Sequence, residues 1–168
     1  LLGMGSCSQD FLEMEPLTDR VEGNFYKTEK DAFEALVSIY DVLQWQSSYG
    51  YHPWDLVSNV LSDDAFSGGS GPGDRPGLNR MGKFSSYTTD EEALGLWKDR
   101  YSGIYRANIF LEKIDGIQFK DEALKDRYIA EARFLRGYFY FELVQFYGHV
   151  PLILKTLTTS EYKQSQAN

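Results

Sequence analysis

The most constraining feature of this sequence is a stretch near its carboxyl end that is apolar all the way around a helix. Residues 134–143 read FLRGYFYFEL, and the pattern from 121 to 147 favours one helix of about 40 Å at 1.5 Å per residue. Because a helix that is hydrophobic on every side is buried from several directions, we expect this one to pack between other elements. Gly148 and Pro151 end it, and residues 150–154 are expected to be extended.

Two helices are expected in the first part of the chain. Thr28, with an acid three residues later, is a capping pattern that predicts a helix over residues 29–46. Its apolar face is expected to consist of Phe33, Leu36, Val37 and Tyr40. Pro53 stands at a first-turn position and predicts a shorter helix that runs through Leu61.

A long loop and a third long helix follow. Glycine and proline recur between residues 66 and 88, which favours neither helix nor strand and predicts a loop. Loops of this length are usually functional or disordered. A cap signal at residues 89–92 opens a helix that Gly116 ends. Its expected apolar stripe consists of Leu94, Trp97, Tyr101, Ile104 and Leu111.

The chain is therefore expected to be all-α, with tetratricopeptide-like stacked helical hairpins and one long Gly/Pro-rich loop. Residues 28–155 form the expected helical domain. Residues 7–27 are expected to be an extended tether, and residues 156–168 a polar segment that leads into a missing remainder. In such a truncated domain the aromatic helix would be partly uncovered, which predicts self-association.

Composition and motifs exclude several functions. A net charge of −8 would repel a phosphate backbone, so nucleic acid is not an expected partner. His52 and His149 are the only histidines, and neither has a second ligand at metal-binding spacing, so no metal or cofactor is expected. Adjacent acids such as Asp63 and Asp64 diverge and cannot flank a glycosidic bond, so no catalytic residues are expected.

Cys7 is the only cysteine, and it follows the apolar and small residues 1–6. This arrangement is similar to the end of a bacterial lipoprotein signal, in which the cysteine is lipidated and becomes the mature amino terminus. Residues 1–6 would then be the remnant of that signal peptide. The alternative is an ordinary free thiol on a frayed terminus.

One stretch carries a family likeness. Residues 130–152, AEARFLRGYFYFELVQFYGHVPL, resemble the signature of SusD-like (RagB/SusD) proteins. The spacing of Trp97, Tyr101, Ile104 and Asn108 supports the likeness, as do the residues SDD at 62–64 and the tether after Cys7. Members of that family are usually several times as long as this chain.

The resemblance implies a non-catalytic lipoprotein on the outer membrane of Bacteroidetes-type bacteria, facing the cell exterior and anchored through Cys7. Such a protein captures oligosaccharides and caps a TonB-dependent, SusC-like transporter. Glycan capture needs a flat ring to stack on the sugar and planar polar groups to pair with hydroxyls. The candidates for these roles in and near the loop are Trp54, Asp63, Asp64, Arg75, Asn79 and Tyr87.

Other interpretations of these residues remain open. The two acids could end a helix, Asn79 could hold a turn, and Trp54 and Tyr87 could belong to the core. Trp97, Tyr101, Arg133 and Arg136 are interpreted as packing and ion-pair residues, and Asn108 as a satisfied buried amide. Two rival functions also remain: a helical-repeat adaptor that binds a peptide without any sugar, and a fragment of a glycoside hydrolase.

Overall fold

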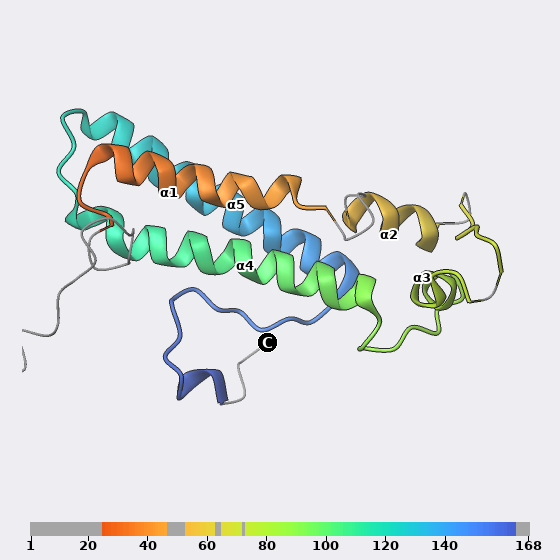
Figure 1. The fold of residues 1–168 in the computed structure, drawn as a ribbon. Coiled ribbons are helices and arrows are strands. Elements are labelled where there is room, and N and C mark those ends of the chain that lie inside the picture. The colour runs from red at the N-terminus through yellow and green to blue at the C-terminus, as the bar shows by residue number, and fades with distance from the viewer. Residues whose placement is uncertain (1–24, 47–52, 63–64, 72, 164–168) are drawn as a thin grey trace, which may run out of the picture.

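The fold is a helical bundle with a smaller helical end. The computed structural model describes residues 25–46, 53–62, 65–71 and 73–163, without the side chains of residues 53, 54 and 56. This part of the chain contains helices and no strands, which confirms the all-α prediction (Figure 1). The α-helices are α1 (Glu29–Asp41), α2 (Pro53–Leu61), α3 (Pro76–Met81), α4 (Glu91–Lys113) and α5 (Glu122–Tyr147). Single 3₁₀ turns lie at Val42–Gln44, Ile114–Gly116 and Glu161–Lys163.

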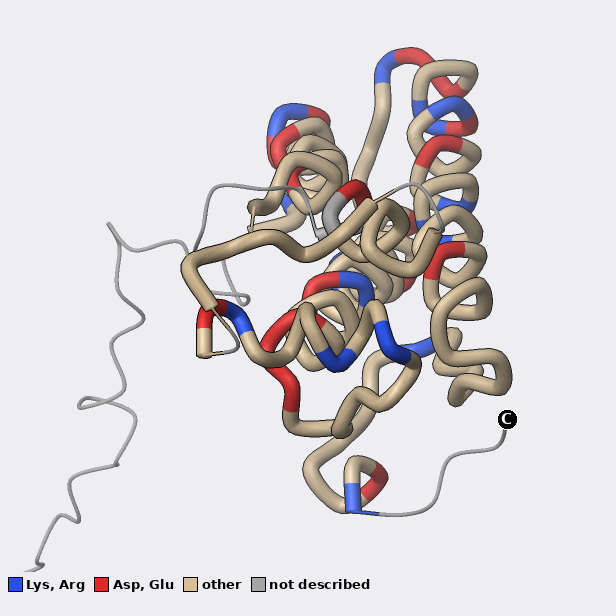
Figure 2. Tube along the Cα trace, turned by 90° about the vertical axis from the view of Figure 1, so that its right-hand side faces the viewer, with Lys and Arg blue, Asp and Glu red and all other residues tan. Residues whose placement is uncertain are grey.

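The aromatic segment forms α5, as its pattern predicted. The Asp121 carboxylate accepts a hydrogen bond from the Ala123 amide at 2.9 Å, and Gly148 ends the helix with a φ of 69°. One face is buried around Leu135 and Phe139. The opposite face leaves Phe134 and other apolar side chains exposed in the described chain. Figure 2 shows that the charged positions of α5 lie mostly in its first half.

Helices α1, α4 and α5 pack side by side, with α4 and α5 as an antiparallel pair (Figure 1). The residues that fill the space between them are large and fully enclosed: Ile39, Ile104, Phe110, Leu135 and Phe139. Removing these side chains from water is the main favourable term in forming the bundle. No α-helix in the described part of the chain is both long enough and apolar enough to cross a membrane.

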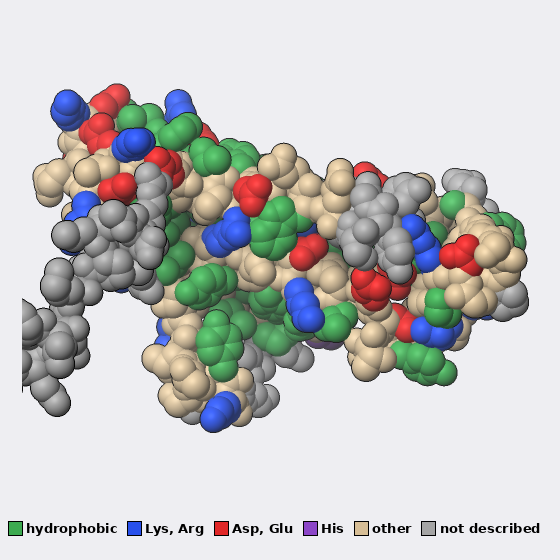
Figure 3. All heavy atoms as spheres, viewed as in Figure 1, with side chains coloured by type: hydrophobic (Ala, Val, Ile, Leu, Met, Phe, Trp, Pro, Cys, Tyr) green, Lys and Arg blue, Asp and Glu red, His purple; other side chains and the backbone are tan. Residues whose placement is uncertain are grey.

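The expected apolar face of α1 is largely wrong. The helix buries Ala32, Ala35, Leu36 and Ile39. Phe33, Val37 and Tyr40 are exposed, and Figure 3 shows hydrophobic side chains along the outer edge of α1. Alanine has no bulk beyond Cβ, so the alanine side of α1 can approach α4 and α5 closely. The predicted end at residue 46 is also too late, because α1 ends at Asp41 and a 3₁₀ turn continues to Gln44.

Two features of the seam between α4 and α5 have no signal in the sequence. Gly103 lies against the ring of Phe139, where an added Cβ would collide with the ring. Arg100 and Glu142 form an ion pair whose side chains are 0% and 1% exposed. The α4 stripe expected from the sequence is buried only in part, because Ile104 is enclosed while Leu94 is exposed.

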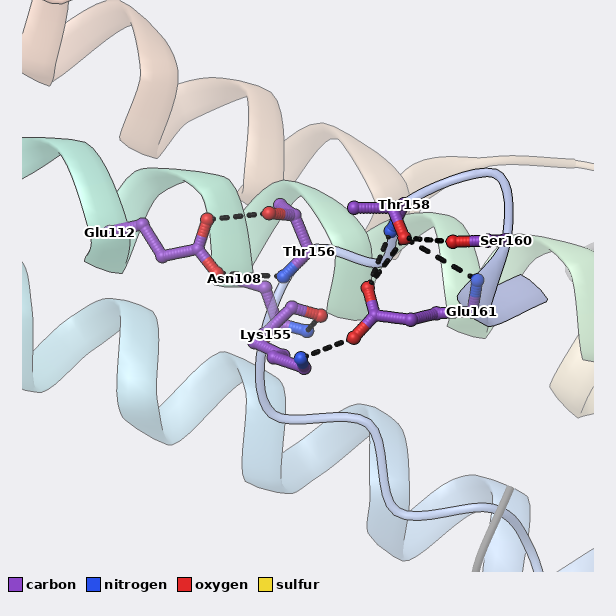
Figure 4. A network of polar contacts seen from close by, with 7 residues as sticks. All are labelled: Asn108, Glu112, Lys155, Thr156, Thr158, Ser160 and Glu161. Atoms are coloured by element: carbon purple, nitrogen blue, oxygen red, sulfur yellow. Dashed lines mark hydrogen bonds and ion pairs between the residues drawn. The ribbon is translucent and has the colours of Figure 1, made fainter. Parts of the chain in front are cut away.

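The residues after α5 return along α4 and are held by polar contacts. Asn108 is buried, and its amide donates to the carbonyls of Ile153 at 2.9 Å and Lys155 at 3.2 Å. Glu112 accepts from the Thr156 amide and hydroxyl, each at 2.7 Å (Figure 4). Arg136 donates to the Asn108 side-chain oxygen at 2.8 Å. Asn108 is thus the satisfied amide that the sequence predicted.

The stretch at 66–88 is not only a loop, which corrects the sequence-based expectation. It contains α3, with Pro76 at the first helical position. Helix α3 packs with α2 around a second, smaller cluster formed by Val57, Val60, Leu78 and Met81. Pro76 at the first position and the buried side chains of Leu78 and Met81 favour this short helix, although the glycines around it do not favour helical structure.

Candidate functional site

A concave site lies where α2 and α3 meet the start of α4 and the end of α5. It is a pocket of about 350 Å³. Val57 and Leu61 from α2, Leu96 from α4 and Phe146 from α5 supply apolar walls. The segment between α3 and α4 closes one side with residues Phe84, Ser86, Tyr87 and Thr88. An apolar concavity with a few polar groups at its edge is the usual form of a small-ligand site.

Asp90 organises this segment. It is the N-cap residue of α4, yet its carboxylate does not cap the helix. It pairs instead with the Arg80 guanidinium and accepts from the Tyr87 amide at 2.8 Å. The hydrogen bond from Arg80 is the main reason that the pKa of Asp90 lies below its ordinary value. Asp90 thereby ties the turn after α3 to the start of α4.

Tyr87 and Phe84 present their rings at the rim of the pocket. The Arg80 guanidinium lies over the Tyr87 ring, 4.9 Å from its centroid, while Tyr87 remains 64% exposed. Phe84 is 81% exposed and has a φ of 52°, which is unusual for a bulky residue. Strained backbone of this kind clusters at functional sites.

The loop before α3 is held by Asn79 and Asp74. The Asn79 amide donates to the Asp74 carbonyl at 2.8 Å, and the Ser67 hydroxyl donates to the Asn79 oxygen at 2.7 Å. Asp74 accepts from the Ser70 amide at 3.0 Å. Arg75 precedes α3 with a left-handed φ of 47°. These contacts give the Gly/Pro-rich stretch a definite shape.

The structure brings only some of the sequence-predicted residues to this site. Tyr87 lines the pocket, whereas Arg75 and Asn79 shape the loop before α3 and do not belong to the lining. The two acids at 63–64 and Cys7 lie outside the described residues, and Trp54 lies in α2 with its side chain outside the description. The glycan-contacting role of all six candidates therefore stays a prediction.

The residues that sequence reasoning missed are Arg80 and Phe84. Both lie in the stretch that was expected to be a long loop without a helix, so neither could be placed beside Tyr87. The only available signal was the pair of rings at 84 and 87, three residues apart in a glycine-rich region. Apolar side chains that gather on a surface often mark an interaction site, whereas single exposed ones are ordinary.

The pocket offers several groups that can contact a ligand. Two aromatic residues, Phe84 and Tyr87, line the pocket together with Ser86, Thr88 and apolar side chains, and the Arg80 guanidinium lies over the Tyr87 ring without belonging to the lining. The Asp90 carboxylate, which accepts a hydrogen bond from the Tyr87 amide, is paired with Arg80. Within residues 25–46, 53–62, 65–71 and 73–163, no group of three or more His, Cys, Asp or Glu could hold a metal ion.

Fold and site together define a helical scaffold that displays a ring-lined binding pocket at one end. The family model described as "Starch-binding associating with outer membrane" matches residues 78–167, more than half of the 168 residues. The chain belongs to this SusD-like family. It is 28% identical to SusD-like protein P25 of Formosa agariphila, over 94% of this chain and 30% of that protein.

Solved structures show the same fold. Surface glycan-binding protein A of Bacteroides thetaiotaomicron aligns with a TM-score of 0.71 and 30% identity, over 79% of this chain and 28% of its own. A complex of that protein with laminarihexaose aligns with a TM-score of 0.69 and 30% identity, over 77% of this chain and 28% of its own. A SusD homologue of the same species gives 0.67 and 32%, over 86% of this chain and 27% of its own. The chain spans about 30% of the length of the curated relatives that it matches.

Proposed function

We propose that this chain captures oligosaccharides at the pocket bounded by Phe84 and Tyr87. The observation that carries the proposal is the pair of exposed rings at the rim of an apolar concavity, one of them held by Arg80 and Asp90. A sugar presents an apolar face that stacks on an aromatic ring, and its hydroxyls pair with polar groups at the edge. The relative crystallised with laminarihexaose supports this ligand class.

The proposal is tested by measuring oligosaccharide affinity in ring variants. Tyr87→Ala and Phe84→Ala should each weaken binding of laminari- or malto-oligosaccharides about tenfold, because a stacked ring contributes on the order of 1.4 kcal/mol. Phe134→Ala is the matched control, since Phe134 is 71% exposed on α5, away from the pocket lining. Calorimetric titration of the three variants separates the site from the scaffold. Equal affinities in all three would refute the site.

The role of the whole protein is proposed from the family. The captured glycan would be delivered to a TonB-dependent, SusC-like transporter, and the protein would be attached to the outer membrane, facing the exterior, through lipidated Cys7. Cys7 itself lies outside the described residues. Incorporation of radioactive palmitate in a suitable bacterial host, lost in Cys7→Ala, supports the anchor. Unlabelled protein favours the helical-repeat adaptor instead.

The proposed mode of action is binding without catalysis. The described residues that line the pocket include no Asp or Glu that could flank a glycosidic bond, and the neighbouring Asp90 is paired with Arg80. Retardation of the protein in a polysaccharide-containing gel, with no reducing sugar released from the same polysaccharide, is the expected result. Release of reducing sugar would favour the hydrolase alternative.

The helical pairs are proposed to begin a tetratricopeptide-like stack. Support comes from the outer face of α5, where Phe134, Phe141 and Val144 are exposed, and from the greater length of the relatives. Further helices would cover this face, since an apolar surface beyond a few hundred Å² usually has a partner. The 168-residue chain alone is then expected to self-associate. A sharp monomeric thermal transition would contradict the stacking proposal.

A further inference from the structure

A second concave surface lies on α4, away from the pocket that Tyr87 lines. It is an open groove of about 590 Å³ between α4, the residues after α1 and the returning carboxyl-terminal segment. Aromatic rings line it, among them Trp45, Trp97, Tyr105 and Tyr162. Figure 3 shows hydrophobic side chains gathered on this face of α4, with basic and acidic ones beside them. None of these residues belongs to the pocket near α2 and α3.

The indole rings are held in fixed orientations. The Trp45 indole donates to the Asp41 carboxylate at 2.7 Å, and the Arg106 guanidinium lies 4.7 Å from its centroid. Trp97 meets Tyr147 edge to face, with centroids 5.1 Å apart. When a ligand stacks on these rings, the ring side chains therefore lose little conformational entropy. This is the basis of preorganised binding.

The opposite wall is also held. The Thr158 amide donates to Glu161 at 2.8 Å, and Glu161 pairs with Lys155 at 2.5 Å (Figure 4). Together with the contacts of Asn108 and Glu112, this network fixes the segment that places Tyr162 at the edge of the groove. The groove is thus formed by ordered elements on both sides.

The charges of the groove differ in sign from those of the whole chain. Lys98 and Arg106 line it, and no described Asp or Glu does, although the chain carries a net charge of −8. Asp41, behind Trp45, lies 3.3 Å from the Arg106 guanidinium and neutralises it in part. No described carboxylate pairs with the Lys98 ammonium, so one cation is available to a ligand at the groove.

We propose that this groove binds a sugar ring that carries an anionic substituent, a carboxylate or a sulfate ester. The ring would stack on the indoles, and the anion would pair with Lys98. Charge complementarity argues for this occupant, because an anionic glycan is repelled by the rest of an acidic chain and is accepted where cations stand beside aromatic faces. The inference rests on the proposed glycan-binding function and adds a second site with a different selectivity.

The test is a calorimetric titration of the full-length protein with galacturonate oligosaccharides, sulfated galactan oligosaccharides and neutral laminari-oligosaccharides. Lys98→Gln should lower the affinity for the acidic oligosaccharides about tenfold, since charge-assisted hydrogen bonds are stronger than neutral ones. The affinity for the neutral oligosaccharide should be unchanged. Preference for one acidic ligand identifies the anion. Lys30→Gln, an exposed lysine on α1, is the control and should leave all three ligands unchanged.

The outcomes separate the two sites. Tyr87→Ala should lower the affinity for the neutral oligosaccharide only. Loss of acidic binding in Tyr87→Ala but not in Lys98→Gln would overturn the second site, as would a wild-type protein that binds neutral but not acidic glycans. Absence of any glycan binding would overturn the proposed function as well. If Lys98 of the folded protein resists an acylating reagent, other polypeptide covers the groove and the inference fails.

Discussion

The bundle of α1, α4 and α5 and the smaller end formed by α2 and α3 differ in how much of their side-chain surface is enclosed. The bundle encloses large side chains such as Phe110 and Phe139 completely and contains a buried ion pair. The smaller end has a four-residue cluster, two non-glycine residues with positive φ and two rings exposed at a pocket. The comparison teaches that the smaller end combines strained backbone with exposed rings around a pocket, while the bundle beside it supplies the large enclosed core.

The largest expected effect comes from the buried pair in the bundle. Glu142→Ala should lower the free energy of unfolding by about 3–5 kcal/mol, because it leaves the Arg100 guanidinium buried without a partner. Urea denaturation measures this. Lys30→Ala, which breaks an exposed pair with Glu34, should cost only about 0.5 kcal/mol or less.

The double variant Arg100→Met with Glu142→Leu sharpens this prediction. An apolar pair of similar volume is often as stable as a buried ion pair, so the double variant should recover most of the loss. If it remains as unstable as Glu142→Ala, the pair contributes something other than mutual charge compensation.

A smaller effect is expected at the seam between α4 and α5. Gly103→Ala should destabilise the protein by about 1–3 kcal/mol, because the new Cβ meets the Phe139 ring. Gly95→Ala, on the same helix with open space around its Cβ position, should stabilise it by about 0.5–1 kcal/mol. The melting temperatures of the two variants should shift in opposite directions if Gly103 lies directly against the Phe139 ring.

The smallest effect concerns the returning segment and its pH dependence. The hydrogen bond from Lys155, followed by those from Thr158, lowers the pKa of Glu161 from 4.5 to about 2. Because the folded pKa is the lower one, this stabilisation is complete above pH 4.5 and is lost as the pH falls toward 2. A carboxyl NMR titration should show that midpoint, and Lys155→Met should raise it. A midpoint unmoved by Lys155→Met would remove Lys155 as the cause.

Sequence reasoning succeeded where local signals agree. The extent of α5 was predicted from the pattern over residues 121–147 and the stop at Gly148, and the proline start of α2 was visible at Pro53. The face of α1 was misassigned because large residues were weighted over Ala32 and Ala35, although small residues allow the closest packing. Helix α3 was missed because glycine composition outweighed Pro76.

The features that remained hidden depend on spatial arrangement. Arg100 and Glu142 meet only because of the register between two helices, which no local pattern encodes. The same holds for the binding end, where Tyr87 was named as a candidate but Arg80 and Phe84 were not. Asp90 was expected near a helix cap, and its use as a partner of Arg80 follows from the fold of α3.

The central claim is that the smaller end holds the neutral oligosaccharide. Hydrogen–deuterium exchange with and without laminarihexaose tests it most directly. The account predicts slower exchange across residues 80–90 when the oligosaccharide is bound and unchanged exchange in the buried halves of α4 and α5. Protection of the exposed face of α5 instead, or none at residues 80–90 while the sugar is bound, would contradict it.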